Sequence, residues 1–107
     1  MILYIAGPMT GLPDNNYPAF DRAERRLREM GFDVLNPARN EAPSLPTWEN
    51  WMRLALAQVI QADGVALLAG WERSRGAKLE VRVAQALGIE TFSVDIWVRD
   101  LSHLATA

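Results

Sequence analysis

Short apolar runs alternate with longer segments of helical periodicity, and this alternation limits the fold more than any other feature of the chain. The four apolar runs cover residues 2–6, 32–35, 65–69 and 91–94, and the helical patterns between them cover residues 18–30, 48–62 and 74–88. Glycine, proline or Asx residues separate the segments, as expected at element ends. A β-α-β-α-β-α-β order is typical of a parallel sheet, because each crossover helix returns the chain to the same edge. The sequence therefore predicts parallel strands with helices on both faces.

Length and composition fit one hydrophobic core. The chain has 107 residues, and half of them are apolar, which is enough for one domain and short for two. We predict an α/β fold in a single domain over residues 1–107: a flavodoxin/Rossmann-like, doubly wound parallel sheet of four to five strands. Residues 96–104 are expected to add a short helix.

Several classes of function are disfavoured by charge and residue content. With 11 basic and 13 acidic residues the net charge is -2, so no electrostatic footprint for nucleic acid is expected. Arginines cluster locally at Arg22, Arg25, Arg26 and Arg28. They fit the solvated face of a helix better than a binding site. No cysteine and a single histidine, His103 in the tail, argue against disulfides and metal sites, and we expect neither metal nor cofactor.

No segment approaches the length of a membrane span. The apolar run 2–6 is too short for a signal peptide. We therefore predict a cytoplasmic protein without membrane contacts.

Glu80 is a carboxylate on an apolar helical stripe. Counting i+3, i+4 and i+7 from Glu80 gives Val83, Ala84 and Leu87, and Gly76 leaves space one turn earlier. A buried carboxylate is costly unless it is paired, hydrogen-bonded or used. Proximity to the helix start, where the dipole and water favour a negative charge, is one explanation. A carboxylate that acts on a ligand at the open end of the helix is the explanation we favour.

Loops with unusual residues follow the predicted strands, at the sheet edge where α/β folds bind ligands. They comprise the loop 7–11, Asn36-Pro37, the loop 70–74 and Asp95. Gly7 and Gly11 bracket either a loop whose amides face a phosphate or an ordinary proline turn. Ser74 and Gly76 open a helix, so Ser74 is predicted as an N-cap, an anion ligand or both.

The chemistry suggested by this edge is attack at a sugar. A carboxylate near a bound phosphate suits a nucleophile at an anomeric carbon, or stabilisation of oxocarbenium-like charge. Trp71 lies just before the helix of Glu80 and could equally stack on a base or pack against the protein. Trp48 and Trp51 are interpreted as packing residues of the second helix.

Longer motifs carry a resemblance to a known family. They are Tyr4 to Gly11 (YIAGPMTG), residues 16–20 (NYPAF), 36–38 (NPA), 70–77 (GWERSRGA) and Glu80. Together they resemble the nucleoside 2-deoxyribosyltransferase-like family, which includes 2'-deoxynucleoside 5'-phosphate N-hydrolases. The chain looks most similar to a branch of small domains from phages and prophages. The likeness extends over almost the whole chain, to about Val94.

The resemblance implies roles for particular residues. Glu80 matches the nucleophilic glutamate of a Ser-x-Gly-x-x-x-Glu pattern that Ser74 and Gly76 complete, and Tyr4 matches an active-site tyrosine. The implied phosphate-binding residues are Gly7, Pro8, Met9, Thr10 and Ser74, with Gly11 closing their loop. Relatives of this kind are dimers or larger, so a homodimer or larger homo-oligomer is implied.

One residue departs from the family pattern. Relatives carry an aspartate eight residues before the aspartate that precedes the third strand, and counting back from Asp63 reaches Ala55. The missing carboxylate would assist as an acid or hold the base. Asp63 itself is interpreted as a turn residue, which leaves Asp14 and Asp95 as candidates to replace the missing group.

From the resemblance we expect a nucleotide-binding, enzyme-like domain. It would act through Glu80 on the N-glycosidic bond of a (deoxy)nucleoside or its 5'-monophosphate, as an N-glycosidase (hydrolase) or a deoxyribosyltransferase. The alternative is a binding protein on the same fold that senses or sequesters a nucleotide without turnover. A third reading is an interaction module in which Trp71 and the arginines face a partner chain.

Overall fold

The structure is a computed structural model that describes residues 1–106. Its strands are β1 (Ile2–Ala6), β2 (Asp33–Leu35), β3 (Gly64–Leu67) and β4 (Glu90–Ser93). Its helices are α1 (Tyr17–Glu29), α2 (Trp48–Gln61), α3 (Arg75–Ala86) and α4 (Val94–Arg99), with short 3-10 turns at Pro13–Asn16, Pro37–Arg39, Trp71–Arg73 and Ser102–Thr106. None of the helices in this part of the chain has the length and apolar character needed to cross a membrane.

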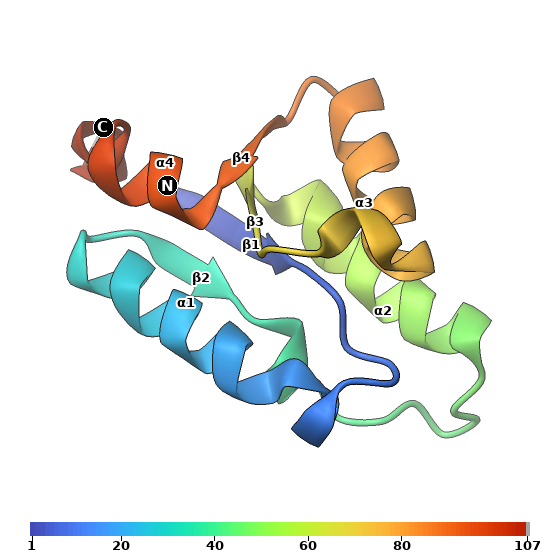
Figure 1. Cartoon of the computed structure of the whole chain (residues 1–107). Coiled ribbons are helices and arrows are strands. Elements are labelled where there is room, and N and C mark those ends of the chain that lie inside the picture. The colour runs from blue at the N-terminus through green and yellow to red at the C-terminus, as the bar shows by residue number, and fades with distance from the viewer. Residues whose placement is uncertain (107) are drawn as a thin grey trace.

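All strand pairs are parallel, and the order across the sheet is β2-β1-β3-β4. Helices α1 and α4 cover one face of the sheet, and α2 and α3 cover the other (Figure 1). This confirms the predicted doubly wound, flavodoxin/Rossmann-like fold, with four strands. Because β1 and β3 occupy the centre, the loops that follow them meet at the middle of one sheet edge.

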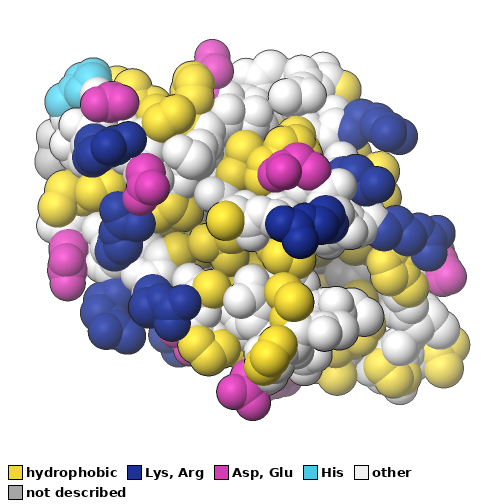
Figure 2. Space-filling model, in the orientation of Figure 1, with side chains coloured by type: hydrophobic (Ala, Val, Ile, Leu, Met, Phe, Trp, Pro, Cys, Tyr) yellow, Lys and Arg dark blue, Asp and Glu magenta, His cyan; other side chains and the backbone are white. Residues whose placement is uncertain are grey.

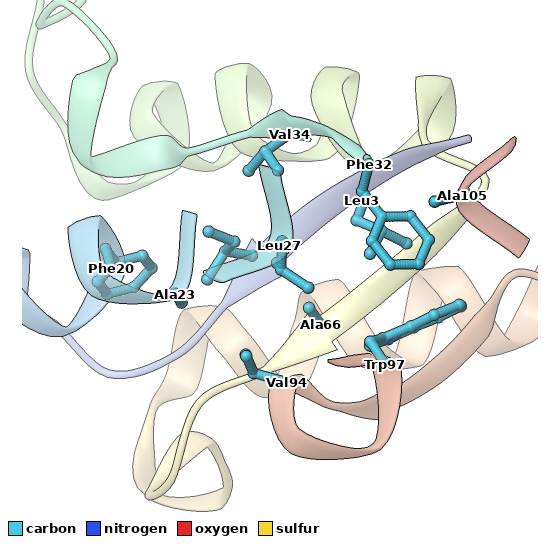
Figure 3. Packing of buried hydrophobic residues seen from close by; sticks show 11 residues of the cluster. Leu3, Phe20, Ala23, Leu27, Phe32, Val34, Ala66, Val94, Trp97 and Ala105 are labelled. Atoms are coloured by element: carbon cyan, nitrogen blue, oxygen red, sulfur yellow. The ribbon is translucent and has the colours of Figure 1, made fainter. Parts of the chain in front are cut away.

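Strand β1 supplies both cores, because successive side chains of a strand point to opposite faces. Leu3 joins the core beneath α1 and α4 (Figure 3), and Ile5 belongs to the same core. Tyr4 and Ala6 join the core beneath α2 and α3. All four side chains are fully buried. The strand alternation thus places the Tyr4 side chain on the same face of the sheet as the helix that carries Glu80.

Helix ends follow the capping residues of the sequence. Thr47 Oγ1 accepts a hydrogen bond from the Asn50 amide at 3.1 Å, and Ser74 Oγ accepts one from the Ala77 amide at 3.1 Å. Both contacts satisfy amides that have no partner within the helix. Gly31 and Gly88, with φ of 98° and 73°, lie just beyond α1 and α3. The left-handed conformation that reverses the chain there is cheapest for glycine.

The apolar stripe predicted from Glu80 to Leu87 is wrong at its carboxyl end. The buried face of α3 consists of Ala77, Glu80, Val81 and Ala84. Leu87 is 57% exposed because the helix ends at Ala86 and Leu87 is its cap. Met30 is 39% exposed for the same reason at the end of α1. Glu80 therefore lies at the edge of the buried face, rather than in its middle.

Candidate active site

A cavity of about 300 Å³ opens at the carboxyl edge of the sheet. The loop after β1 contributes Gly7, Met9 and Thr10 to its lining, and the segment after β2 contributes Pro37 and Asn40. The start of α3 contributes Ser74 and Gly76. The volume lies at the lower end of the range for small-molecule sites. Loops from three different strands thus converge where the sequence analysis placed a site.

Tyr4 and Glu80 form a buried pair in the lining of this cavity. The Tyr4 hydroxyl donates a hydrogen bond to Glu80 Oε2 at 2.6 Å. Tyr4 is fully buried, and Glu80 is 6% exposed. Such a short O–H···O⁻ distance is typical of a charge-assisted hydrogen bond. The pair joins the central strand to α3, and it fixes one carboxylate oxygen.

Burial raises the pKa of Glu80 to about 7, against the lowering effect of the Tyr4 hydrogen bond. Burial, the charge of Glu80 and the hydrogen bond to Glu80 together raise the pKa of Tyr4 well above its ordinary value. Tyr4 therefore keeps its proton at neutral pH and remains a donor. Glu80 changes its protonation state near neutrality, where such a change can serve catalysis.

The second carboxylate oxygen of Glu80 faces the cavity. The hydrogen bond of this side chain involves Oε2, and no residue of 1–106 supplies a partner for Oε1. Within the same range, no fully buried side-chain oxygen or nitrogen lacks a partner. Oε1 must therefore keep some contact with open space, and Glu80 lines the cavity. One oxygen is held by the protein and the other is available to a ligand.

The raised pKa of Glu80 predicts a specific dependence of stability on pH. In the folded protein the pKa is about 7, and its unperturbed value is 4.5, so the folded state binds more protons between these values. Ionisation of buried Glu80 therefore lowers the free energy of unfolding by roughly 3 kcal/mol as pH rises from about 4.5 to 7. Glu80→Gln should show little difference from the wild type at pH 4 and greater stability at pH 8. Urea denaturation of both proteins across this range measures the difference, and a difference independent of pH would contradict the assignment.

Aromatic side chains form another part of the lining: Tyr17, Phe20, Trp48 and Trp51. The sequence analysis interpreted Trp48 and Trp51 as packing residues. Trp48 does pack against the core beneath α2 and α3, but both tryptophans are only partly buried, and both border the cavity. Their i, i+3 spacing at the start of a helix that follows an edge loop was the available signal.

Asn15 borders the cavity and was not predicted. It belongs to a left-handed stretch in which Asp14, Asn15 and Asn16 have φ of 52°, 52° and 60°. Asn and Asp tolerate this conformation better than other residues with a side chain. The Asn16 side-chain amide donates to the Pro8 carbonyl at 2.9 Å, which ties the turn to the loop after β1. A run of Asn and Asp before a helix was the signal.

A buried polar cluster holds the segment after β2 against α1. Asn36 Nδ2 donates to Glu24 Oε1 at 2.9 Å, and its Oδ1 accepts from the Ala38 amide at 2.9 Å. Burial alone would raise the pKa of Glu24, but hydrogen bonds from Arg39, Asn36 and Arg28, with the charge of Arg39, lower it to about 2. Glu24 therefore stays ionised, and the cluster fixes the segment that brings Pro37 and Asn40 to the cavity.

Most predicted site residues meet at this cavity. Seven of them line it: Tyr4, Gly7, Met9, Thr10, Ser74, Gly76 and Glu80. Pro8 and Gly11 belong to the same loop as Gly7, but they do not line the cavity. Trp71 lies elsewhere, in a second depression shared with residues at the ends of β3 and β4. Stacking of Trp71 on a ligand beside Glu80 therefore has no support in the geometry.

Two glycines are closely packed, and the packing is tighter at Gly7 than at Gly76. A Cβ on Gly7 would lie 2.7 Å from Leu68 Cβ, so any side chain would separate the loop from the end of β3. A Cβ on Gly76 would lie 3.1 Å from Met52 Sδ, within the contact between α3 and α2. Both positions border the cavity. Glycine here lets the backbone approach a neighbour closely, which is one of its common uses near ligands.

Ala55, where the resemblance implies a carboxylate, lines the cavity together with Glu80. The candidate replacements lie elsewhere. Asp63 Oδ2 accepts from the Ile2 amide at 2.8 Å, as a turn residue, and Asp95 pairs with Arg26 at 2.8 Å. Asp14 is exposed and does not border the cavity. Glu80 is therefore the one carboxylate in the lining among residues 1–106.

The part of the chain described by the structure holds no group of three or more His, Asp or Glu side chains suited to a metal ion. The four clustered arginines, Arg22, Arg25, Arg26 and Arg28, are exposed on α1. Figure 2 shows acidic side chains among the basic ones on that part of the surface. Two of them also make contacts within the protein: Arg26 pairs with Asp95, and Arg28 pairs with Glu24.

A search of curated proteins finds no match to this chain. A protein-family model, described as a domain of unknown function (DUF4406), matches residues 1–93. The matched region runs from the start of the chain through β4 and includes every residue that lines the cavity. The chain therefore belongs to the DUF4406 family.

Proposed function

We propose that this protein binds a (deoxy)nucleoside or its 5'-monophosphate and acts on the N-glycosidic bond through Glu80. The observation that carries the proposal is the Tyr4–Glu80 pair, a 2.6 Å hydrogen bond between two buried side chains at a ligand-sized cavity. A structural ion pair would satisfy both carboxylate oxygens, whereas here Oε1 remains available. The motifs of the resemblance to nucleoside 2-deoxyribosyltransferase-like proteins include both residues.

In the proposed reaction, ionised Glu80 attacks the anomeric carbon of the sugar through Oε1. A bond forms between this oxygen and the carbon, and the C–N bond breaks, so the base leaves with the electron pair and takes a proton from water. Tyr4 donates to Oε2 throughout and keeps the carboxylate oriented. Water then hydrolyses the glycosyl ester, or a second base displaces Glu80 and completes a transfer.

The remaining lining suits the other parts of such a ligand. Half-buried Trp48 and Trp51 offer flat apolar surfaces to a base. Ser74 and the first amides of α3 offer donors to a phosphate. Apolar walls with a few convergent polar groups are typical of small-molecule sites.

A second function is favoured by Ala55. An alanine lines the cavity where the resemblance implies a carboxylate, and no other acidic residue of 1–106 joins Glu80 there. Protonation of the leaving base then lacks a second carboxyl group as its donor. The same cavity would in that case bind a nucleotide for sensing or sequestration, with little or no turnover.

The test of the proposed function is incubation of the protein with a panel of nucleosides and 5'-monophosphates, followed by chromatography of the released bases. Base release supports the N-glycosidase or transferase function, and addition of a second free base distinguishes transfer from hydrolysis. Binding without release supports the alternative. Absence of both would contradict the two proposals together.

A 5'-monophosphate is expected to stabilise the protein against heat more than the matching nucleoside does. A ligand present at about 100 times its dissociation constant adds roughly 2.7 kcal/mol to the free energy of unfolding, a shift of several degrees in a domain of this size. Differential scanning fluorimetry with matched ligand pairs measures it.

Ser74→Ala should reduce the part of this shift that depends on the phosphate. Loss of the N-cap also lowers the melting temperature of the free protein by itself. Thr47→Ala provides the matched control, because Thr47 caps α2 in the same way and does not border the cavity. Equal shifts from nucleoside and monophosphate would instead indicate a site that is indifferent to phosphate.

A further inference from the structure

Arg75 lies against the aromatic wall of the cavity. Its guanidinium carbon is 3.7 Å from the centre of the Trp48 ring, a close cation–π contact. Trp48 borders the cavity, and Arg75 is the first residue of α3, directly after the cap residue Ser74. Arg75 itself is exposed. The contact therefore holds a positive charge at the rim of the cavity, on the side where α3 begins.

The position of Arg75 is electrostatically unfavourable in the free protein. The arginines that form ion pairs with carboxylates of residues 1–106 are Arg26, Arg28 and Arg39, and Arg75 is not among them. A cation at the first turn of a helix also opposes the helix dipole. An exposed cation–π contact compensates only weakly. Arg75 is thus a charge without an acidic partner in the described chain, next to a ligand-sized space.

The cavity needs a cation if its ligand carries a phosphate. No Lys, Arg or His of residues 1–106 lines it, and its one carboxylate within that range, Glu80, is buried. A phosphate in the cavity would repel ionised Glu80 and favour its protonated, non-nucleophilic form. A positive charge close to the phosphate reduces this repulsion. A candidate is the guanidinium of Arg75, which follows Ser74 in the sequence and lies over the Trp48 ring that lines the cavity.

We propose that Arg75, held over Trp48, binds the phosphate of the ligand and makes the site selective for 5'-monophosphates over nucleosides. The planar guanidinium suits bidentate contact with phosphate oxygens. Stacking on Trp48 limits its conformations before the ligand arrives, so less freedom is lost on binding. This inference rests on the proposed function, because it names the substrate class of the same cavity.

The experiment is isothermal titration calorimetry with the four common 2'-deoxynucleoside 5'-monophosphates and the matching nucleosides. Arg75→Gln should weaken binding of the preferred monophosphate by about 10- to 100-fold, and should change nucleoside affinity less than twofold. Arg75→Lys should fall between, since it keeps the charge and loses the planar fork. The monophosphate affinity of Arg75→Gln should also depend less steeply on salt than that of the wild type.

Arg82→Gln is the matched control. Arg82 is exposed on the same helix, seven residues further on, or about 10 Å along its axis. Arg82→Gln makes the same change in net charge as Arg75→Gln. The affinity of this variant for the monophosphate should stay within twofold of the wild type.

Four outcomes would overturn the inference. Unchanged monophosphate affinity in Arg75→Gln would show that the arginine only packs on Trp48. Equal losses for monophosphate and nucleoside would show that it acts through the aromatic wall. Wild-type binding of nucleosides but not of monophosphates would remove this inference and leave the proposed function in place. If the wild type binds neither kind of ligand, the proposed function itself fails, and this inference fails with it.

Discussion

Glu80→Gln is expected to abolish base release while the fold survives. Glutamine has nearly the same shape as glutamate, and its side-chain oxygen can still accept the hydrogen bond that Tyr4 donates at 2.6 Å in the wild type. The amide cannot attack an anomeric carbon or stabilise positive charge on the sugar. Loss of a nucleophile typically costs several orders of magnitude in rate, and we expect a decrease of about 1,000-fold or more.

Chromatography of released bases under single-turnover conditions measures this change, with circular dichroism and thermal melting as evidence of folding. Glu72→Gln is the control, because Glu72 is exposed and does not border the cavity that holds Glu80. It should retain wild-type rates. A folded Glu80→Gln protein with full activity would remove Glu80 from the mechanism.

The fold and the inward side of Glu80 could be predicted because both depend on periodicity, whereas the active-site role of Tyr4 was implied only by the family resemblance. Strand alternation in β1 fixes Leu3 and Ile5 on one face and Tyr4 on the other. Helical spacing put Glu80 on the side of α3 that turns toward the sheet, although the buried face is centred closer to Ala77 and Ala84 than the sequence suggested. A parallel sheet then brings the ends of β1 and β3 to one edge, so the convergence of their loops follows from topology.

The positions of the tryptophans relative to the cavity were predicted incompletely, because they depend on how non-regular segments turn. Trp71 is placed by a 3-10 turn that follows Gly70, whose φ of 87° directs the chain toward the ends of β3 and β4. Trp51 borders the cavity because α2 starts beside it. Helical periodicity alone assigned Trp51 to the core. Such placements are set by tertiary contacts, which a pattern of apolar residues does not encode.

The proposed reaction places two opposite demands on the carboxyl groups of the site. Glu80, with a pKa of about 7, is the sole carboxylate in the lining within residues 1–106. It cannot attack the sugar and protonate the leaving base in the same step, because the first role needs the ionised form and the second the protonated form. Glycosidases solve this problem with two carboxyl groups whose pKa values differ. Ala55 marks the place where this protein could acquire the second group.

Ala55→Asp is expected to raise base release by roughly 100- to 10,000-fold over the wild type, or to create it where the wild type only binds. Ala55 is 7% exposed and borders the cavity together with Glu80. Burial and the neighbouring carboxylate would raise the pKa of the new aspartate, so that it keeps the proton which a general acid donates. The same burial should lower thermal stability, and assays therefore belong well below the melting temperature.

The double variant Ala55→Asp with Glu80→Gln should be inactive, because a general acid cannot replace the nucleophile. Ala57→Asp is the matched control, since Ala57 is exposed on the same helix and does not line the cavity. If the aspartate reaches the cavity, it should also shift the pH at which Glu80 titrates, which NMR of the carboxyl carbons can detect. Such a shift without any gain in rate would mean that the leaving base receives its proton from water or from another group, and that the missing carboxylate does not limit turnover.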